Sequence, residues 1–109
     1  MARRGRIGEF ELIARYFAPL ARTFKGAGNL QSDNAFLAAD PRHDLVVKTD
    51  TVVAGVHFLA DESPQRVAAK ALRVCLSDLA AGGAMPFVYQ LSLALPARWT
   101  EKWLAGFAK

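Results

Sequence analysis

Two aspartates, Asp50 and Asp78, stand in segments that are mostly apolar, and a third, Asp33, is a candidate to join them at one site. Asp50 lies within the run VVKTDTVVAGVHF (46–58), whose β-branched residues are typical of a buried strand, and Asp78 continues the apolar stripe of a helix expected over 64–81. Asp33 lies in a polar loop. A buried carboxylate is costly unless its charge is compensated. Carboxylates from a loop, a strand and a helix end are suited to a hard cation such as Mg²⁺, which takes oxygen ligands.

Asp78 breaks two local rules at once. It occupies an apolar position, and it lies in the last turn of its expected helix, where the macrodipole disfavours negative charge. Such conflicts are expected at functional sites, although an Asp78 that turns outward and caps a neighbouring loop is an equal alternative. Thr49 could add an oxygen ligand. In a regular strand, however, Thr49 and Asp50 point to opposite faces, so both side chains can bind one metal only if the backbone is irregular.

The other reactive residue types give weaker signals. His57 stands at the end of the expected strand, where a histidine is usually only a satisfied polar residue, and His43 lies in a turn. The single cysteine, Cys75, excludes an internal disulfide and fits a reducing cytosol. The segment GNLQSDN (28–34) lacks the glycine spacing of a phosphate-binding loop or a dinucleotide fingerprint.

Length and charge narrow the possible classes of protein. The chain has 109 residues, enough for one domain, which we expect over 8–109 after a basic, disordered tail at 1–7. The net charge of +4 includes Arg3, Arg4 and Arg6 of that tail, so the rest is close to neutral and nucleic-acid binding is not expected. No apolar run approaches the roughly 18 residues of a membrane span, so no membrane partner is expected either.

The expected elements alternate in an α, β, β, α, β, α order, which indicates an α/β (α+β) fold. A helix is expected over 8–24 that kinks or stops near Ala18, because Pro19 lies inside it. The helix expected over 64–81 begins after the capping residue Ser63 and stops at two glycines. A last helix begins after Thr100 and has no terminating signal, so we expect a fragment of a longer protein. The expected strands are 35–39, 45–53 and 87–95.

Four segments then identify a family. GEFELIARYF (8–17), TDTVVAGVHF (49–58), KALRVCLSDLAAGGAMP (70–86) and LSLALP (91–96) resemble, in this order, the N-terminal third of thiamine-monophosphate kinase. That family belongs to the aminoimidazole ribonucleotide synthetase-like superfamily. The resemblance implies a four-stranded mixed sheet with helices on one face, which pairs in a homodimer to form a barrel. It also implies a cytoplasmic enzyme that uses ATP and Mg²⁺ to convert thiamine monophosphate to thiamine diphosphate.

The resemblance assigns roles to individual residues. Asp33, Thr49, Asp50 and Asp78 match magnesium ligands of the family, and His57 matches a position that contacts thiamine phosphate. No catalytic residue is assigned, and the residues that bind the nucleotide are unknown.

This chain also departs from the family pattern. Gln31 and Ser32 replace a glycine and an aspartate of the family's acidic loop, and Lys48 stands where a serine or threonine is usual. Lys48 could contact phosphate or compete with a metal. Because of these departures, the alternative function is a non-catalytic, degenerate or truncated dimerisation module, and another ATP-using member of the superfamily is a third reading. We expect this chain alone to be inactive as a kinase.

Overall fold

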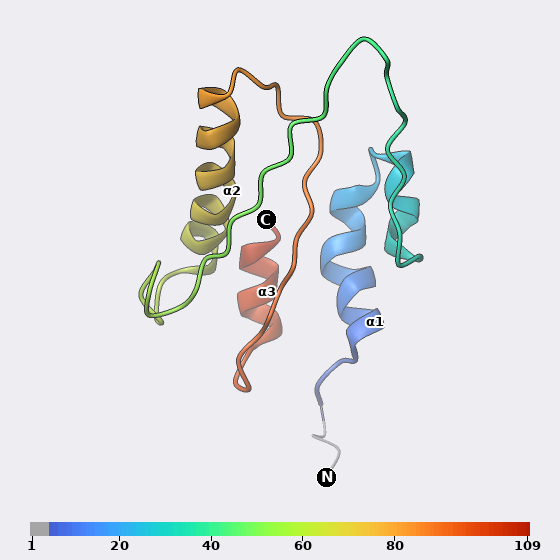
Figure 1. The fold of residues 1–109 in the computed structure, drawn as a ribbon. Helices are drawn as coiled ribbons and strands as arrows, with labels where there is room; N and C mark the ends of the chain where they lie inside the picture. Colours follow the sequence, from blue (N-terminus) through green and yellow to red (C-terminus); the bar gives the residue numbers. More distant parts are fainter. Residues whose placement is uncertain (1–4) are drawn as a thin grey trace. The chain divides into compact units, whose positions relative to one another are not determined.

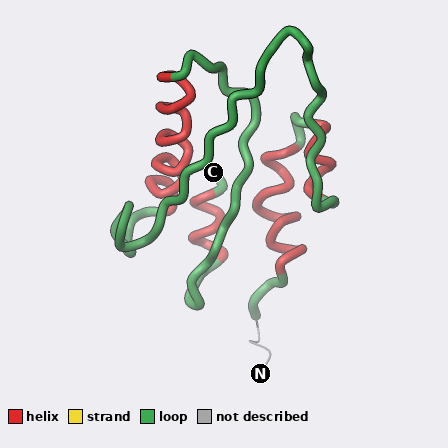
Figure 2. Tube along the Cα trace, viewed as in Figure 1, coloured by secondary structure: helices red, strands yellow, loops and turns green. Residues whose placement is uncertain are grey.

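The structure is a computed structural model that describes residues 5–109, so part of the tail predicted over 1–7 lies outside the described residues. The chain divides into two compact units, one ending at Pro41 and one running from Arg42 to Phe107, and each is described by itself. Figure 1 follows the chain through its helices, and Figure 2 separates helices from loops. Among the described residues, no helix is both long and apolar enough to cross a membrane.

The first unit is built from short helical segments with different hydrogen-bond patterns. The α-helix α1 (Glu9–Leu12) continues as a π-helical turn, η1 (Ile13–Phe17), and then as a 3₁₀ turn, η2 (Ala18–Ala21). The predicted helix over 8–24 is therefore found in a shorter and irregular form. The change at η2 has a physical cause, because Pro19 has no N–H to donate and cannot continue the α-helical ladder.

A second 3₁₀ segment, η3 (Lys25–Leu30), lies in the region predicted to be a loop, and its turns are interrupted at Gly28 and Asn29, which both have a φ of +56°. Gly26 lies so close to a neighbouring segment that a Cβ there would be only 1.9 Å from the carbonyl oxygen of Phe36. The backbone of Phe36 donates a 2.8 Å hydrogen bond to the Gly26 carbonyl. Only glycine permits this approach of two backbones, and the contact fixes the start of the loop that carries Asp33.

The second unit contains the longest helix, α2 (Pro64–Ala81), with the bounds expected from the sequence. Its Ser63 hydroxyl accepts a hydrogen bond from the backbone of Arg66 at 3.4 Å, and Gly83 leaves the helix with a φ of +70°. The final helix, α3 (Glu101–Phe107), is capped by Thr100, which accepts from the backbone of Trp103 at 3.1 Å. Both predicted helix starts are confirmed.

The core of the second unit lies between these two helices. Val67 of α2 is 4% exposed and Leu104 of α3 is fully buried, and these are the buried apolar residues among those described. The helices approach closely because Gly106 has no side chain: a Cβ there would lie 2.7 Å from Cγ of Pro64. Trp103 and Phe107 stack along α3 with their ring centroids 5.3 Å apart.

The expected sheet is absent, and this part of the fold prediction is wrong. Residues 5–109 contain no strand, so neither the four-stranded mixed sheet with helices on one face nor its half of a barrel is found. The β-type pairing that the described residues do contain is a single isolated bridge between Ala54 and Phe58. The segments predicted as strands at 35–39, 45–53 and 87–95 are loops in this structure.

The reason lies in what an alternating apolar pattern can and cannot specify. It shows which side chains could share one face of a sheet, but a sheet is stable only when several strands pair and bury that face. Here the apolar side chains of these segments stay exposed, for example Val47 at 87%, Phe87 at 70% and Tyr89 at 64%. The segments therefore gain neither burial nor ladder hydrogen bonds from their pattern.

Candidate functional site

Two of the predicted ligands converge on one lysine. The ammonium of Lys48 lies 2.7 Å from Oδ2 of Asp78 and 3.2 Å from Oδ2 of Asp50. Lys48 and Asp50 are two residues apart, a spacing that puts their side chains on the same side of an extended segment, and Asp78 comes from the last turn of α2. Asp50 and Asp78, which are 28 positions apart in the sequence, thus both contact the Lys48 ammonium.

Lys48 offsets the unfavourable position of the Asp78 carboxylate at the end of its helix. A carboxylate in the last turn of a helix is disfavoured by the macrodipole, and α2 has no basic residue in that turn. The Lys48 ammonium supplies the missing positive charge from another segment. The alternative of an outward-turned Asp78 is correct in part, since the side chain is 53% exposed and holds a neighbouring segment.

The two carboxylates keep this lysine charged. The hydrogen bond to Asp78, which has the larger effect, and the hydrogen bond to Asp50 raise the pKa of Lys48 above its ordinary value of 10.5. A raised lysine pKa means that the ion pairs stabilise the fold at neutral pH and lose this effect only as pH rises through the raised value. Because the three side chains are 31% to 53% exposed, solvent screens the pairs and their contribution to stability is small.

His57 is held in a tight turn next to the start of α2. Its Nδ1 accepts a 2.9 Å hydrogen bond from the backbone of Val53, and its own backbone donates to the Val53 carbonyl at 2.8 Å. Gly55 turns the chain with a φ of +78°. An imidazole whose Nδ1 accepts carries its proton on Nε2 when neutral. The exposed His57 ring therefore has an N–H donor available for an anionic group.

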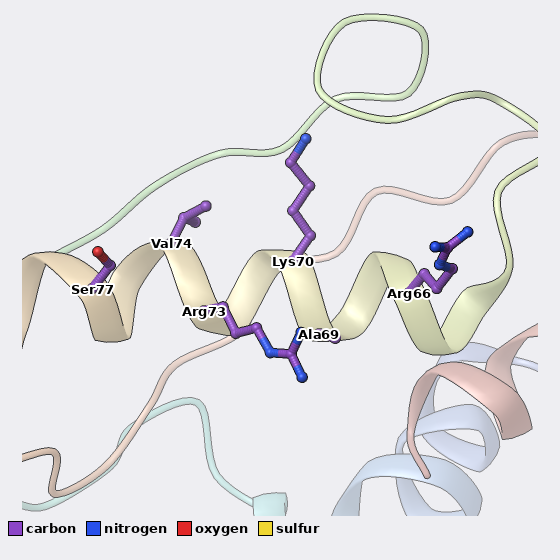
Figure 3. A pocket seen from close by; sticks show the side chains of 6 residues that line it. All are labelled: Arg66, Ala69, Lys70, Arg73, Val74 and Ser77. Carbon is purple, nitrogen blue, oxygen red and sulfur yellow. The ribbon is translucent and has the colours of Figure 1, made fainter.

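The α2 helix fixes this turn as well as the carboxylate pair. The ammonium of Lys70 donates a hydrogen bond to the His57 carbonyl. Figure 3 shows Lys70 projecting from α2 toward the chain that passes beside the helix. One helix thus holds His57 through Lys70 and Lys48 through Asp78.

A basic stripe on α2 was missed by the sequence analysis. It borders a shallow hollow of about 360 Å³ whose lining residues are Arg66, Ala69, Lys70, Arg73, Val74 and Ser77 (Figure 3). The signal was available, because the three basic residues follow one another at spacings of 4 and 3 within the predicted helix. Arg66 is partly engaged, with its guanidinium 3.6 Å from Glu62.

The remaining predicted ligands lie in exposed segments. Thr49 is exposed. Asp33 belongs to the first unit, in an exposed loop where Ser32 accepts a 3.2 Å hydrogen bond from the backbone of Asn34. No group of three or more His, Cys, Asp or Glu residues within 5–109 is arranged to hold a metal. The assignment of Asp33 and Thr49 as metal ligands stays a prediction.

The carboxylate pair does have the chemistry of a cation site. Oδ2 of Asp50 and Oδ2 of Asp78 both reach the same cation, and carboxylate oxygens are the ligands that Mg²⁺ prefers. In this structure the cation is the Lys48 ammonium. A divalent ion placed between the same two oxygens would need Lys48 to move away.

Comparisons with known proteins agree with the resemblance seen in the sequence. The family described as "AIR synthase related protein, N-terminal domain" matches residues 31–109. A thiamine-monophosphate kinase of Caulobacter vibrioides is 48% identical over 89 residues, which make up 82% of this chain and 25% of that protein. Those of Escherichia coli and Salmonella typhimurium are each 45% identical over 102 residues, or 93% of this chain and 31% of theirs.

The predicted resemblance to thiamine-monophosphate kinase is confirmed by these relatives. This chain spans between a quarter and a third of their length. No solved structure matches the chain significantly. The matched family region includes Asp33, Asp50, His57 and Asp78, so the residues of interest all fall within it.

Proposed function

We propose that this chain forms the N-terminal part of a kinase that phosphorylates thiamine monophosphate with ATP to give thiamine diphosphate. The chain belongs to the family of N-terminal domains of AIR synthase related proteins, which matches residues 31–109. The observation that carries this proposal is the convergence of Asp50 and Asp78 on one cation in a chain whose relatives are named thiamine-monophosphate kinases. The proposed cofactors are ATP and Mg²⁺.

Each site residue has a proposed role. In the second unit, Asp50 and Asp78, with Thr49, would hold Mg²⁺, which in phosphoryl transfer neutralises charge on the phosphate groups. Asp33 is the magnesium ligand proposed in the first unit. His57 would direct its Nε2–H to the phosphate of thiamine monophosphate, since its Nδ1 is already engaged by the Val53 backbone. When phosphate groups approach the cluster, the Lys48 ammonium has a second anionic partner available besides the two carboxylates.

A chimera tests this function. This chain would replace the matching segment of the Escherichia coli relative, which supplies the rest of a thiamine-monophosphate kinase. We expect the chimera to form thiamine diphosphate from thiamine monophosphate and ATP, measured by separation of the products, and this chain alone to form none. A folded chimera that binds ATP but gives no thiamine diphosphate would contradict the proposal.

Lys48 favours a second candidate function, a non-catalytic module of the same family. The Lys48 ammonium already offsets part of the negative charge of the two carboxylates, which a serine or threonine cannot do. The chimera separates the candidates: turnover supports the kinase, whereas turnover that appears only after Lys48→Thr supports a degenerate copy.

We also propose that the chain forms a homodimer. Large apolar side chains are exposed in the second unit, including Val47, Phe87 and Tyr89, and extended apolar patches are uncommon on the surfaces of monomers. Sedimentation velocity at micromolar concentration is expected to show a dimer or larger species. A well-folded monomer at high micromolar concentration would contradict this prediction.

The proposed location is the cytoplasm. The single Cys75 favours it, because a chain with one cysteine forms no internal disulfide and gains nothing from an oxidising compartment.

A further inference from the structure

The lysine between the two carboxylates has a consequence for metal binding. A Mg²⁺ ion shared by Asp50 and Asp78 would lie where the two carboxylates converge, and the Lys48 ammonium is at that place, 3.2 and 2.7 Å from their Oδ2 atoms. A tethered cation is present at these oxygens at a fixed and high effective concentration, whereas Mg²⁺ must arrive from solution and lose part of its tightly held water shell. The two cations therefore compete for one place.

We propose that Lys48 is a tethered competitor for the divalent cation at Asp50 and Asp78. In the free chain the ammonium holds the pair, and Mg²⁺ alone binds there weakly. Mg²⁺ that arrives with phosphate groups is different, because the phosphates bring further oxygen ligands to the metal and an anionic partner for the displaced ammonium. The competition thus makes metal binding at this pair depend on the nucleotide.

Two features of the geometry favour competition over a passive surface ion pair. The ammonium contacts both carboxylates rather than one, so it occupies the position from which a single metal ion would bridge them. The side chain of Lys48 is also only 31% exposed, although it lies in a segment whose residues are exposed. The side chain thus lies along the protein surface toward the pair instead of extending into solvent.

The inference deepens the proposed function because it concerns the same carboxylates, but its test does not involve thiamine monophosphate. Lys48→Met keeps the length of the side chain and removes its charge. The matched control is Lys102→Met, which removes the same charge from an exposed position on α3, and Lys48→Arg keeps the charge at the site. Mg²⁺ affinity would be measured by isothermal titration calorimetry at constant ionic strength, and melting temperature by circular dichroism with chelator or millimolar Mg²⁺.

We expect Lys48→Met to bind Mg²⁺ on the order of ten-fold more tightly than the wild type, a moderate gain because the pairs are partly exposed. Its melting temperature should rise on addition of Mg²⁺, since a ligand that binds the folded state stabilises it. Lys102→Met and Lys48→Arg should behave like the wild type. Adding Asp78→Asn to Lys48→Met should abolish the gain, which places the metal at this pair.

Equal Mg²⁺ affinity of the wild type and Lys48→Met, whether tight or weak, would overturn the inference. If Lys48→Met is unfolded in chelator because the carboxylates repel each other, recovery of the folded spectrum in Mg²⁺ is the expected result, and no recovery would also overturn it. A gain in affinity by Lys48→Met in a chain whose chimera shows no turnover would leave the inference standing and reject the kinase. Turnover by the chimera without any gain in Mg²⁺ affinity by Lys48→Met would support the kinase and overturn the inference.

Discussion

Asp78→Asn in the chimera with the Escherichia coli relative is expected to lower the rate of thiamine diphosphate formation by about 100-fold or more. Loss of a residue that only orients a metal ligand typically costs about 10- to 100-fold in affinity or activity, and loss of the ligand itself should cost at least as much. Under the proposed function, Asp78 is such a ligand and lies within reach of the same cation as Asp50. Initial rates at saturating ATP, at the Mg²⁺ concentration that just saturates the wild-type chimera, provide the measurement.

The loss of rate should not come from unfolding. Asp78→Asn removes the partner of Lys48 at 2.7 Å, which weakens the fold, but it also removes a negative charge from the last turn of α2, which favours the helix. The two effects oppose each other, so the melting temperature of the variant should stay close to that of the wild type. Asp61→Asn is the matched control, because Asp61 is an exposed aspartate of the same unit.

A chimera with Asp78→Asn that keeps the wild-type rate would show that this carboxylate is only the structural partner of Lys48. Partial rescue by a higher Mg²⁺ concentration would instead support the role of a ligand, since weaker binding can be offset by mass action. The dependence of the rate on Mg²⁺ concentration separates these outcomes.

The local signals in the sequence were sufficient for the helices of the second unit. Ser63 followed by proline at one end and two glycines at the other gave α2 its bounds, because capping depends on residues adjacent in sequence. The strands depended on something else. Pairing needs a second segment at the right distance, and the exposed Val47 and Phe87 show that a suitable pattern alone does not provide one.

Some residues of the candidate site could be predicted from the sequence, and one could not. Asp50 and Asp78 could be found from the sequence because each breaks the pattern of its own segment. The lysine between them breaks no local pattern, since a lysine in an exposed segment is ordinary. Its position became visible only when the structure placed the segment of Lys48 next to the end of α2. The departure from the family at this position pointed to Lys48 but left open whether it would contact phosphate or compete with a metal.

Leu104→Ala is expected to be the most destabilising single substitution in the second unit. Leu104 is fully buried in α3, and it provides the core together with Val67 of α2. Truncation of a buried leucine removes its burial and leaves a cavity, which together cost about 2–5 kcal/mol. Because so few apolar side chains of this unit are buried, the neighbours have little other packing to replace the lost contacts. The melting temperature should fall by at least about 10 °C.

Leu59→Ala provides the control, since the same atoms are removed from a side chain that is 70% exposed in the same unit. Exposed substitutions usually change the free energy of unfolding by no more than about 0.5 kcal/mol. Circular dichroism during heating, and urea unfolding at constant temperature, should therefore separate the two variants clearly. If both variants melted at the same temperature, the contact of α3 with α2 through Leu104 and Gly106 would not be the core of this unit in solution. If Leu59→Ala were the more damaging change, the exposed apolar surface would be covered in the folded protein, as the proposed homodimer requires.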